Sequence, residues 1–193
     1  MWPLVFGPPV GNELAIGAWL IGILAMVWIL VTSSRWIART IWKEKARMQN
    51  ALKEYRTLLS QVPPRLLSIS DHESSVHPSP DKWSKKEILG HLIDSASNNH
   101  QRFVRAQLGS EIRLPEYDQE SWVQTQAYQE ESWENLVQLW KVYNLHLLHI
   151  AAAIPDDKLG NLCFIGEKEP VTLEFLFADY VQHLKHHLQQ IFG

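Results

Sequence analysis

Two histidines near the C-terminal end have the spacing of metal ligands. His183 and His187 lie four residues apart in an apolar stripe of the segment 173–191. Rings at positions i and i+4 of a helix project from one face, one turn apart, and this suits two ligands of one ion. His186 lies about 100 degrees from that face. Because buried imidazoles without partners are costly, the alternative is a pair of hydrogen-bonded core histidines.

His91 is the candidate for a third ligand. Alone it is typical of a satisfied histidine at a core boundary, but a site formed by His183 and His187 needs another ligand. Gly90 beside it would let another group approach closely. Three polar residues follow along the same edge, Asp94, Ser95 and Asn98. These are candidates to orient a ligand histidine, although Asp94 could equally lie at the solvent edge.

The remaining histidines give weaker signals. His146 and His149 form a rival pair, three residues apart, but they flank the apolar stripe of their segment, and solvated side chains are the favoured interpretation. His100 lies opposite the proposed face of its helix. His72 and His77 lie in a predicted loop and indicate nothing.

Four amphipathic helices must position these side chains. We predict helices over 36–60, 85–107 and 133–154, and a last helix from Thr172 to the C-terminus. Their expected start signals are the Ser84–Glu87 capping box, Ser132 and Thr172. Without a convincing sheet, this pattern predicts an all-α four-helix bundle.

The connections between the helices are long. Pro63 and Pro64 are expected to end the first helix, and 64–81 has no periodicity, so it is predicted to be a loop. The segment 109–131 is predicted to be a polar connection with a helical turn near Trp122. The segment 159–171 is expected to form a loop or a short hairpin.

The N-terminal region predicts a membrane anchor. Residues 14–31 contain no charged side chain, and their length is near the minimum for a spanning helix. Basic residues follow this run and none precede it, so the positive-inside rule places the C-terminal domain in the cytoplasm. The expected order is a tail (1–13), a transmembrane helix (14–34), a basic juxtamembrane helix (35–47) and a globular domain (48–193).

Two alternatives to this anchor remain open. A cleaved signal peptide would require a basic start and a shorter apolar core than this sequence has. The second alternative is that translation starts at Met48, in which case the protein would be cytoplasmic. The main prediction is a single-pass protein of the cell membrane.

Composition excludes several classes of protein. The net charge is −3, so no basic surplus indicates a nucleic-acid partner. Hydrophobic residues make up 46% and charged residues 20%, which argues against wholesale disorder. Cys163 is the one cysteine and cannot form an internal disulfide. It is more typical of an apolar loop residue than of a reactive thiol.

Two segments resemble a known family. The segment from Trp83 to Ser95 resembles the W-S-x-x-E-x-x-x-H-L-x-D-S segment of the DinB-like superfamily, including its YfiT-type candidate metal hydrolases. Residues 180–191 are similar to that family's final H-x-x-H-H-x-x-x-I helix. The resemblance covers about 48–192 and implies an up-down-down-up four-helix bundle, often a homodimer. It also implies a divalent metal held by His91, His183 and His187. The apolar N-terminal run is not part of the family pattern.

Three neutral imidazoles would leave open coordination positions, as in catalytic sites. Zinc or nickel is favoured, and manganese or iron is allowed. The expected function is that of a membrane-anchored metal-dependent hydrolase or thiol-dependent transferase, with no general base identified, since Glu87 is as well explained by capping. The alternatives are a non-catalytic metal-binding module serving a membrane protein partner and a helical interaction protein without metal. The substrate is not predicted.

Overall fold

The structure is a computed structural model that describes the backbone of residues 12–193. Between residues 12 and 41 it describes the side chains of Met26, Trp28, Thr32 and Thr40 only. The chain divides into two units, one ending at Trp42 and the other comprising Lys43–Gly193.

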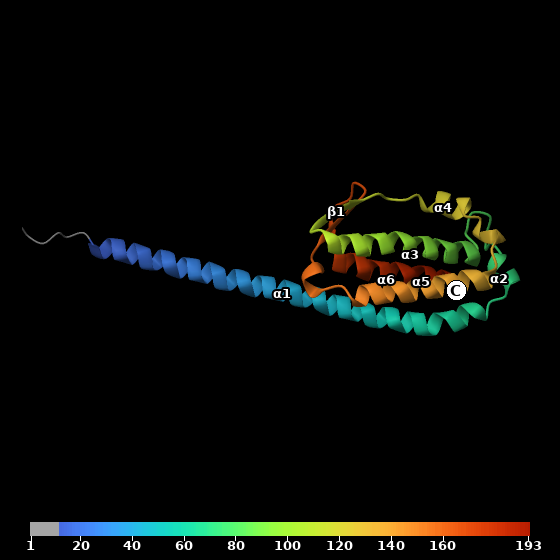
Figure 1. Cartoon of the computed structure of the whole chain (residues 1–193), viewed down its shortest axis with the longest axis horizontal. Coiled ribbons are helices and arrows are strands. Elements are labelled where there is room, and N and C mark those ends of the chain that lie inside the picture. Colours follow the sequence, from blue (N-terminus) through green and yellow to red (C-terminus); the bar gives the residue numbers. More distant parts are fainter. Residues whose placement is uncertain (1–11) are drawn as a thin grey trace, which may run out of the picture. The chain divides into compact units, whose positions relative to one another are not determined.

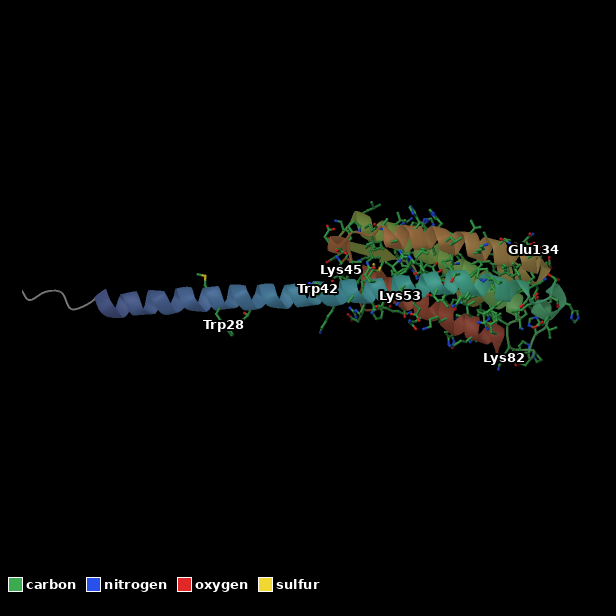
Figure 2. The ribbon with its side chains drawn as sticks, turned by 90° about the horizontal axis from the view of Figure 1, so that it is seen from below. Trp28, Trp42, Lys45, Lys53, Lys82 and Glu134 are labelled. Atoms are coloured by element: carbon green, nitrogen blue, oxygen red, sulfur yellow. The ribbon has the colours of Figure 1, made fainter. Side chains whose placement is uncertain are left out.

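The first unit contains the start of a long helix, α1 (Asn12–Leu67). Figure 2 shows Trp28 and Trp42 projecting from this helix, and both side chains are largely exposed to solvent. Among the residues that the structure describes, no helix is long and apolar enough to cross a membrane. The side chains of the predicted transmembrane segment, 14–34, lie almost entirely outside the described ones.

The second unit is a four-helix bundle formed by the later part of α1 with α3 (Lys85–Leu108), α5 (Trp133–Ala152) and α6 (Leu173–Phe192). Figure 1 shows these helices packed side by side. Their apolar faces form one buried core. At its centre Asn144 accepts hydrogen bonds from the hydroxyls of Tyr55 and Tyr180, so the buried phenols have a polar partner.

Contacts between helix ends establish the directions of the helices. Trp133 Nε1 donates to the carbonyl of Leu66 over 2.8 Å, which places the end of α1 at the start of α5. The guanidinium of Arg65 lies 3.7 Å from the centre of the Phe192 ring, which places the end of α1 at the end of α6. Figure 1 shows α3 running in the same direction as α5. The bundle therefore has the expected up-down-down-up topology.

The predicted end of the first helix was wrong. Helix α1 continues through Pro63 and Pro64 to Leu67. Each proline removes one hydrogen bond of the ladder. However, Val62 and Leu66 are buried in the core, and this burial offsets the loss. Tertiary packing thus extends the helix by one turn beyond its local stop signal.

The predicted starts of the other three helices are confirmed. Ser84 caps α3, and its capping box with Glu87 is complete, because each side chain bonds the other's backbone N–H. Ser132 caps α5 and Thr172 caps α6 through bonds to the backbone N–H three residues on. These local signals suffice because they depend only on neighbouring residues.

A small sheet corrects the all-α prediction. Strands β1 (Glu111–Leu114), β2 (Leu162–Ile165) and β3 (Val171–Thr172) pair in the order β1-β2-β3. The β2–β3 pair forms a short hairpin, which is one of the two alternatives, loop or hairpin, that the sequence predicts for 159–171. The parallel β1–β2 pair, in which Glu111 faces Leu162, was not predicted. Its partners are far apart in sequence and its strands are very short, so no local pattern marks it.

Short helices interrupt the connections. Helix α2 (Asp71–Ser75) lies in the predicted loop, and α4 (Gln119–Thr125) matches the expected turn near Trp122. Two 3₁₀ turns also lie in these connections, Tyr128–Glu130 and Asp156–Lys158.

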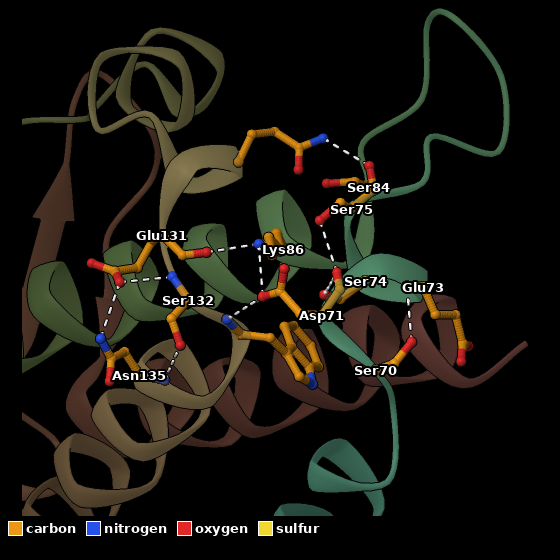
Figure 3. A network of polar contacts seen from close by, with 12 residues as sticks. Ser70, Asp71, Glu73, Ser74, Ser75, Ser84, Lys86, Glu131, Ser132 and Asn135 are labelled. Carbon is orange, nitrogen blue, oxygen red and sulfur yellow. Dashed lines mark hydrogen bonds and ion pairs between the residues drawn. The ribbon is translucent and has the colours of Figure 1, made fainter.

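A polar network fastens α2 to the bundle (Figure 3). The buried ammonium of Lys86 donates to the carbonyl of Glu131 over 2.7 Å and lies 3.0 Å from the carboxylate of Asp71. Asp71 also accepts the backbone N–H of Trp133. These bonds hold the pKa of Asp71 below its usual value, the Trp133 bond most of all. The network joins the starts of α2, α3 and α5.

Candidate metal centre

Three imidazole rings meet between α3 and α6. His91 comes from α3, and His183 and His187 come from α6. One nitrogen from each ring lies within 4.8 Å of one from each of the others. The Nε2 atoms of His91 and His183 are 3.1 Å apart. Two nitrogens bound tetrahedrally to a zinc ion about 2.0–2.1 Å away would lie about 3.3 Å apart. The spacing therefore fits two ligands of one small cation.

The neighbours of the rings restrict their movement. Each ring stands edge-on to the other two, with centroids 4.5–5.0 Å apart. The indole of Trp83, which precedes the cap of α3, lies against His91 with ring centroids 5.2 Å apart. His91 is fully buried, whereas His183 and His187 are half-buried. The cluster thus has a closed side at His91 and an accessible side at α6.

The surroundings keep the rings neutral at physiological pH. Burial, together with the other two imidazoles, lowers the pKa of His91 from 6.5 to about 3. Burial, together with His187 and its neighbour His186, lowers the pKa of His183 to about 4. Burial also lowers the pKa of His187, although its bond to Gln190 acts in the opposite direction. Neutral imidazole is the form that binds a metal.

A hydrogen bond at one nitrogen of an imidazole ring determines whether the other nitrogen is free to bind an ion. Nδ1 of His187 lies 2.9 Å from Oε1 of Gln190, which can only accept, so Nδ1 carries the proton and Nε2 is free to bind. Nδ1 of His183 lies 3.5 Å from the hydroxyl of Ser95, a long contact. Nδ1 of His91 is buried and has no hydrogen-bond partner in the described part of the chain.

The three polar candidates on α3 have different surroundings. Ser95 is the one that contacts a ring of the cluster. Asp94 instead accepts bonds from the Tyr128 hydroxyl, over 2.7 Å, and from Gln126 Nε2, over 2.5 Å. Asn98 donates to the carbonyl of Asp94 in its own helix. Within the described contacts, neither Asp94 nor Asn98 reaches one of the three imidazoles.

Gly90 allows the close approach that the sequence indicated. A Cβ atom there would lie 2.1 Å from Cδ2 of Tyr128, well inside contact distance. The Tyr128 ring therefore packs directly on the helix backbone beside His91, and its hydroxyl reaches Asp94. Any larger residue at position 90 would displace this ring.

The other histidines lie elsewhere. His186, His146 and His149 are exposed, as predicted. Exposure does not leave all of them without contacts, since the ring of His186 lies 5.1 Å from that of His187 between centroids. His100 is partly buried, and its Nδ1 lies 3.2 Å from the Tyr143 hydroxyl.

A cavity of about 520 Å³ opens beside the cluster. Helix α3 contributes Ser95, Asn99 and Arg102 to its lining, and α6 contributes His183. Cys163 of β2 lines it as well, and burial raises the pKa of its thiol to about 11, so it is protonated at neutral pH. His183 belongs to both the histidine cluster and the cavity lining, and Ser95 of the lining contacts it, so a molecule in the cavity can reach the cluster.

Sequence reasoning missed several residues of this region. Gln190 follows His187 by three residues, a spacing that could have indicated their bond. Trp83 lies just before the predicted helix 85–107 and Arg102 lies within it, but neither residue was predicted to have a role in the site. Tyr128 and Gln126 could not be found, because they reach Asp94 from a distant irregular segment.

Comparisons with known proteins agree with this architecture. The sequence profile of the DinB superfamily matches residues 51–191. A candidate metal-dependent hydrolase of Oceanobacillus iheyensis is 21% identical over 140 residues, which span 72% of this chain and 80% of that protein.

Two solved structures share the fold. YfiT of Bacillus subtilis, described as a candidate metal-dependent hydrolase with an unusual four-helix-bundle topology, superposes with a TM-score of 0.64 at 20% identity and covers 77% of this chain and 83% of its own. The mycothiol-dependent maleylpyruvate isomerase superposes with a TM-score of 0.63 at 12% identity and covers 75% of this chain and 60% of its own. The profile match includes both helices that carry the histidine cluster, and the chain belongs to the DinB superfamily.

Proposed function

We propose that this protein is a metal-dependent enzyme whose ion is held by His91, His183 and His187. One observation carries the proposal, which is the convergence of three neutral imidazoles at the edge of a cavity. The favoured activity is hydrolysis, because the Oceanobacillus relative and YfiT are both described as candidate metal-dependent hydrolases. Imidazole ligands favour zinc or nickel.

The chain's own groups would have defined roles in such a reaction. A bound divalent ion supplies Lewis acidity that activates a nucleophile at neutral pH. His91 lies on the closed side of the cluster, where Trp83 holds its ring. Gln190 holds the tautomer of His187, which leaves Nε2 unprotonated, so that it could bind an ion. The cavity beside His183 would receive the substrate next to the three imidazoles that would hold the ion.

A thiol-dependent transferase is the second candidate. The cavity of about 520 Å³ is within the usual size range of sites for small molecules. One of the proteins with a similar fold depends on mycothiol. In a thiol-dependent transfer reaction, the nucleophile would be the sulfur of a small thiol that enters the cavity. A non-catalytic metal-binding module is the outcome if metal is bound and neither reaction occurs.

Metal content tests the proposal most directly. The full-length chain, purified without chelator and reconstituted with zinc or nickel, is expected to bind one ion per chain by mass spectrometry. His183→Ala and His187→Ala should lose it, whereas His186→Ala is the matched control and should retain it, because this neighbour is exposed. A wild-type protein that stays empty after reconstitution would refute the proposal. Ester, amide and thiol-transfer screens of the loaded protein then separate the two reactions.

We also propose that the N-terminal segment anchors the protein in the cell membrane with the bundle in the cytoplasm. The support is the uncharged run 14–31 followed by basic residues. Protease treatment of sealed vesicles tests it. The bundle should be protected when only the outer side of the membrane is exposed, and digestion from that side would contradict the orientation.

A further inference from the structure

Arg102 is a partly buried cation of the cavity lining, and the proposed metal chemistry gives it no role. It lies on α3 with Ser95 and Asn99, which also line the cavity. His91 is eleven residues earlier, so the two residues belong to one stripe of the helix and are separated by about 16 Å along its axis. The metal cluster and Arg102 thus lie toward different ends of the same cavity wall.

The guanidinium of Arg102 has no strong partner. It is partly buried, and within the described residues it makes no hydrogen bond and no ion pair. Burial lowers the pKa of Arg102, and the nearby Tyr117, Cys163 and Glu116 offset only part of this shift. Burying a cation without a hydrogen-bonded anion is costly, so such a group is typical of a binding site whose ligand supplies the anion.

The other charged residues of the cavity do not fill this role. Lys168 and Glu116 form their own ion pair, with Nζ and Oε1 2.6 Å apart. Glu169 and Asp179 are exposed to solvent. Among the described residues of the lining, this leaves Arg102 as one unpaired cation and Glu169 and Asp179 as two unpaired carboxylates, so a ligand with a single negative charge is favoured over a phosphate dianion.

We propose that Arg102 binds a carboxylate of the substrate and sets its position in the cavity, so that the reacting group at the other end of the molecule faces the histidine cluster. This proposal rests on the proposed function, because the reacting group is placed at the metal. The substrate class is therefore an elongated molecule with a carboxylate at one end. A guanidinium fits a carboxylate in two parallel hydrogen bonds, which fixes orientation as well as charge.

Hydroxamates that carry an ω-carboxylate test the proposal, because the hydroxamate binds a metal and the tail reports on Arg102. The probes are a series of increasing chain length, each compared with its uncharged methyl ester. Binding to the zinc-loaded full-length chain is measured by calorimetry for the wild type, Arg102→Gln and Arg102→Lys. Arg105→Gln is the matched control, because Arg105 is an exposed arginine one turn further on the same helix. Thermal melting of each variant shows whether it is folded.

In the wild type, one chain length of the acid should bind about tenfold or more tighter than its ester, the effect of a charged hydrogen bond. Arg102→Gln should abolish this preference without changing the affinity of the ester. Arg102→Lys should keep part of the preference, and Arg105→Gln should keep all of it.

Two other outcomes have separate meanings. If the acids and esters bind the wild type equally, or if Arg102→Gln retains the preference, the Arg102 proposal is refuted and the metal site stands. If neither probe binds the zinc-loaded chain, the ion cannot be reached by a ligand, and the proposed enzymatic function fails together with the proposal that depends on it.

Discussion

Gly90→Ala should destabilise the bundle, although alanine is the better helix former. The new Cβ would lie 2.1 Å from Tyr128 Cδ2, whereas ordinary contacts begin at 3.4 Å, so the ring would have to move by 3.4 − 2.1 = 1.3 Å. That movement breaks the 2.7 Å bond from the Tyr128 hydroxyl to Asp94. The substitution therefore tests whether the ring truly packs on the helix backbone.

The expected cost follows from three contributions. Overpacking costs about 1–3 kcal/mol, and losing a hydrogen bond to a charged group costs about 1.5–3 kcal/mol. Replacing glycine by alanine within a helix returns about 1 kcal/mol. The net loss of unfolding free energy is therefore about 3 kcal/mol.

Urea denaturation followed by circular dichroism measures this loss. Gly109→Ala is the control, because its Cβ would lie 3.6 Å from the nearest atom, an ordinary contact, and it should change stability by less than about 0.5 kcal/mol. In a Tyr128→Ala background the clash is absent, and Gly90→Ala should be neutral or slightly stabilising. A cost below about 0.5 kcal/mol in the wild type, or the same cost in both backgrounds, would refute the reasoning.

Three further predictions concern the site and its helix. The pKa values of His91 and His183 are lowered from 6.5 to about 3 and about 4 in the fold, so their contribution to the stability of the metal-free protein is complete above pH 6.5 and is lost as the pH falls toward 4. Melting temperatures across this range should fall less steeply in a His91→Gln, His183→Gln variant, and an equal slope would contradict the assignment. Cys163, buried and with its pKa raised to about 11, should react with a thiol reagent at mildly alkaline pH only after unfolding; rapid labelling of the native protein would show that it is accessible. Ser84→Ala removes the cap of α3 and should cost about 1–2 kcal/mol in urea denaturation, whereas Glu87→Gln, which keeps an acceptor, should cost less, and the reverse order would disprove the capping role.

Local signals predicted the parts of the fold that depend on neighbouring residues. The caps of α3, α5 and α6 were identified because a capping side chain and its backbone partner are three residues apart. The pairing of His183 with His187 was found for the same reason, since helical periodicity alone places them on one face. The close approach at Gly90 was also anticipated, although its partner was not.

Features that depend on distant residues could not be predicted in this way. The continuation of α1 through Pro63 and Pro64 depends on a core that the other three helices complete. The partner of Asp94 is Tyr128, which comes from an irregular segment with no periodicity to place it. The β1–β2 pair joins segments about fifty residues apart.

The cavity wall combines two kinds of structure that differ in their tolerance of change. The histidines lie on helices whose buried faces form the core, so their spacing is fixed by the packing of the whole bundle. The outer wall comes from connections, the segment around Tyr117 and the β2–β3 hairpin. Connections accept insertions and substitutions at small cost in free energy. Exchanging the hairpin between relatives should therefore alter which molecules enter while the imidazoles keep their positions, so this protein offers a scaffold on which selectivity can be redesigned separately from reactivity.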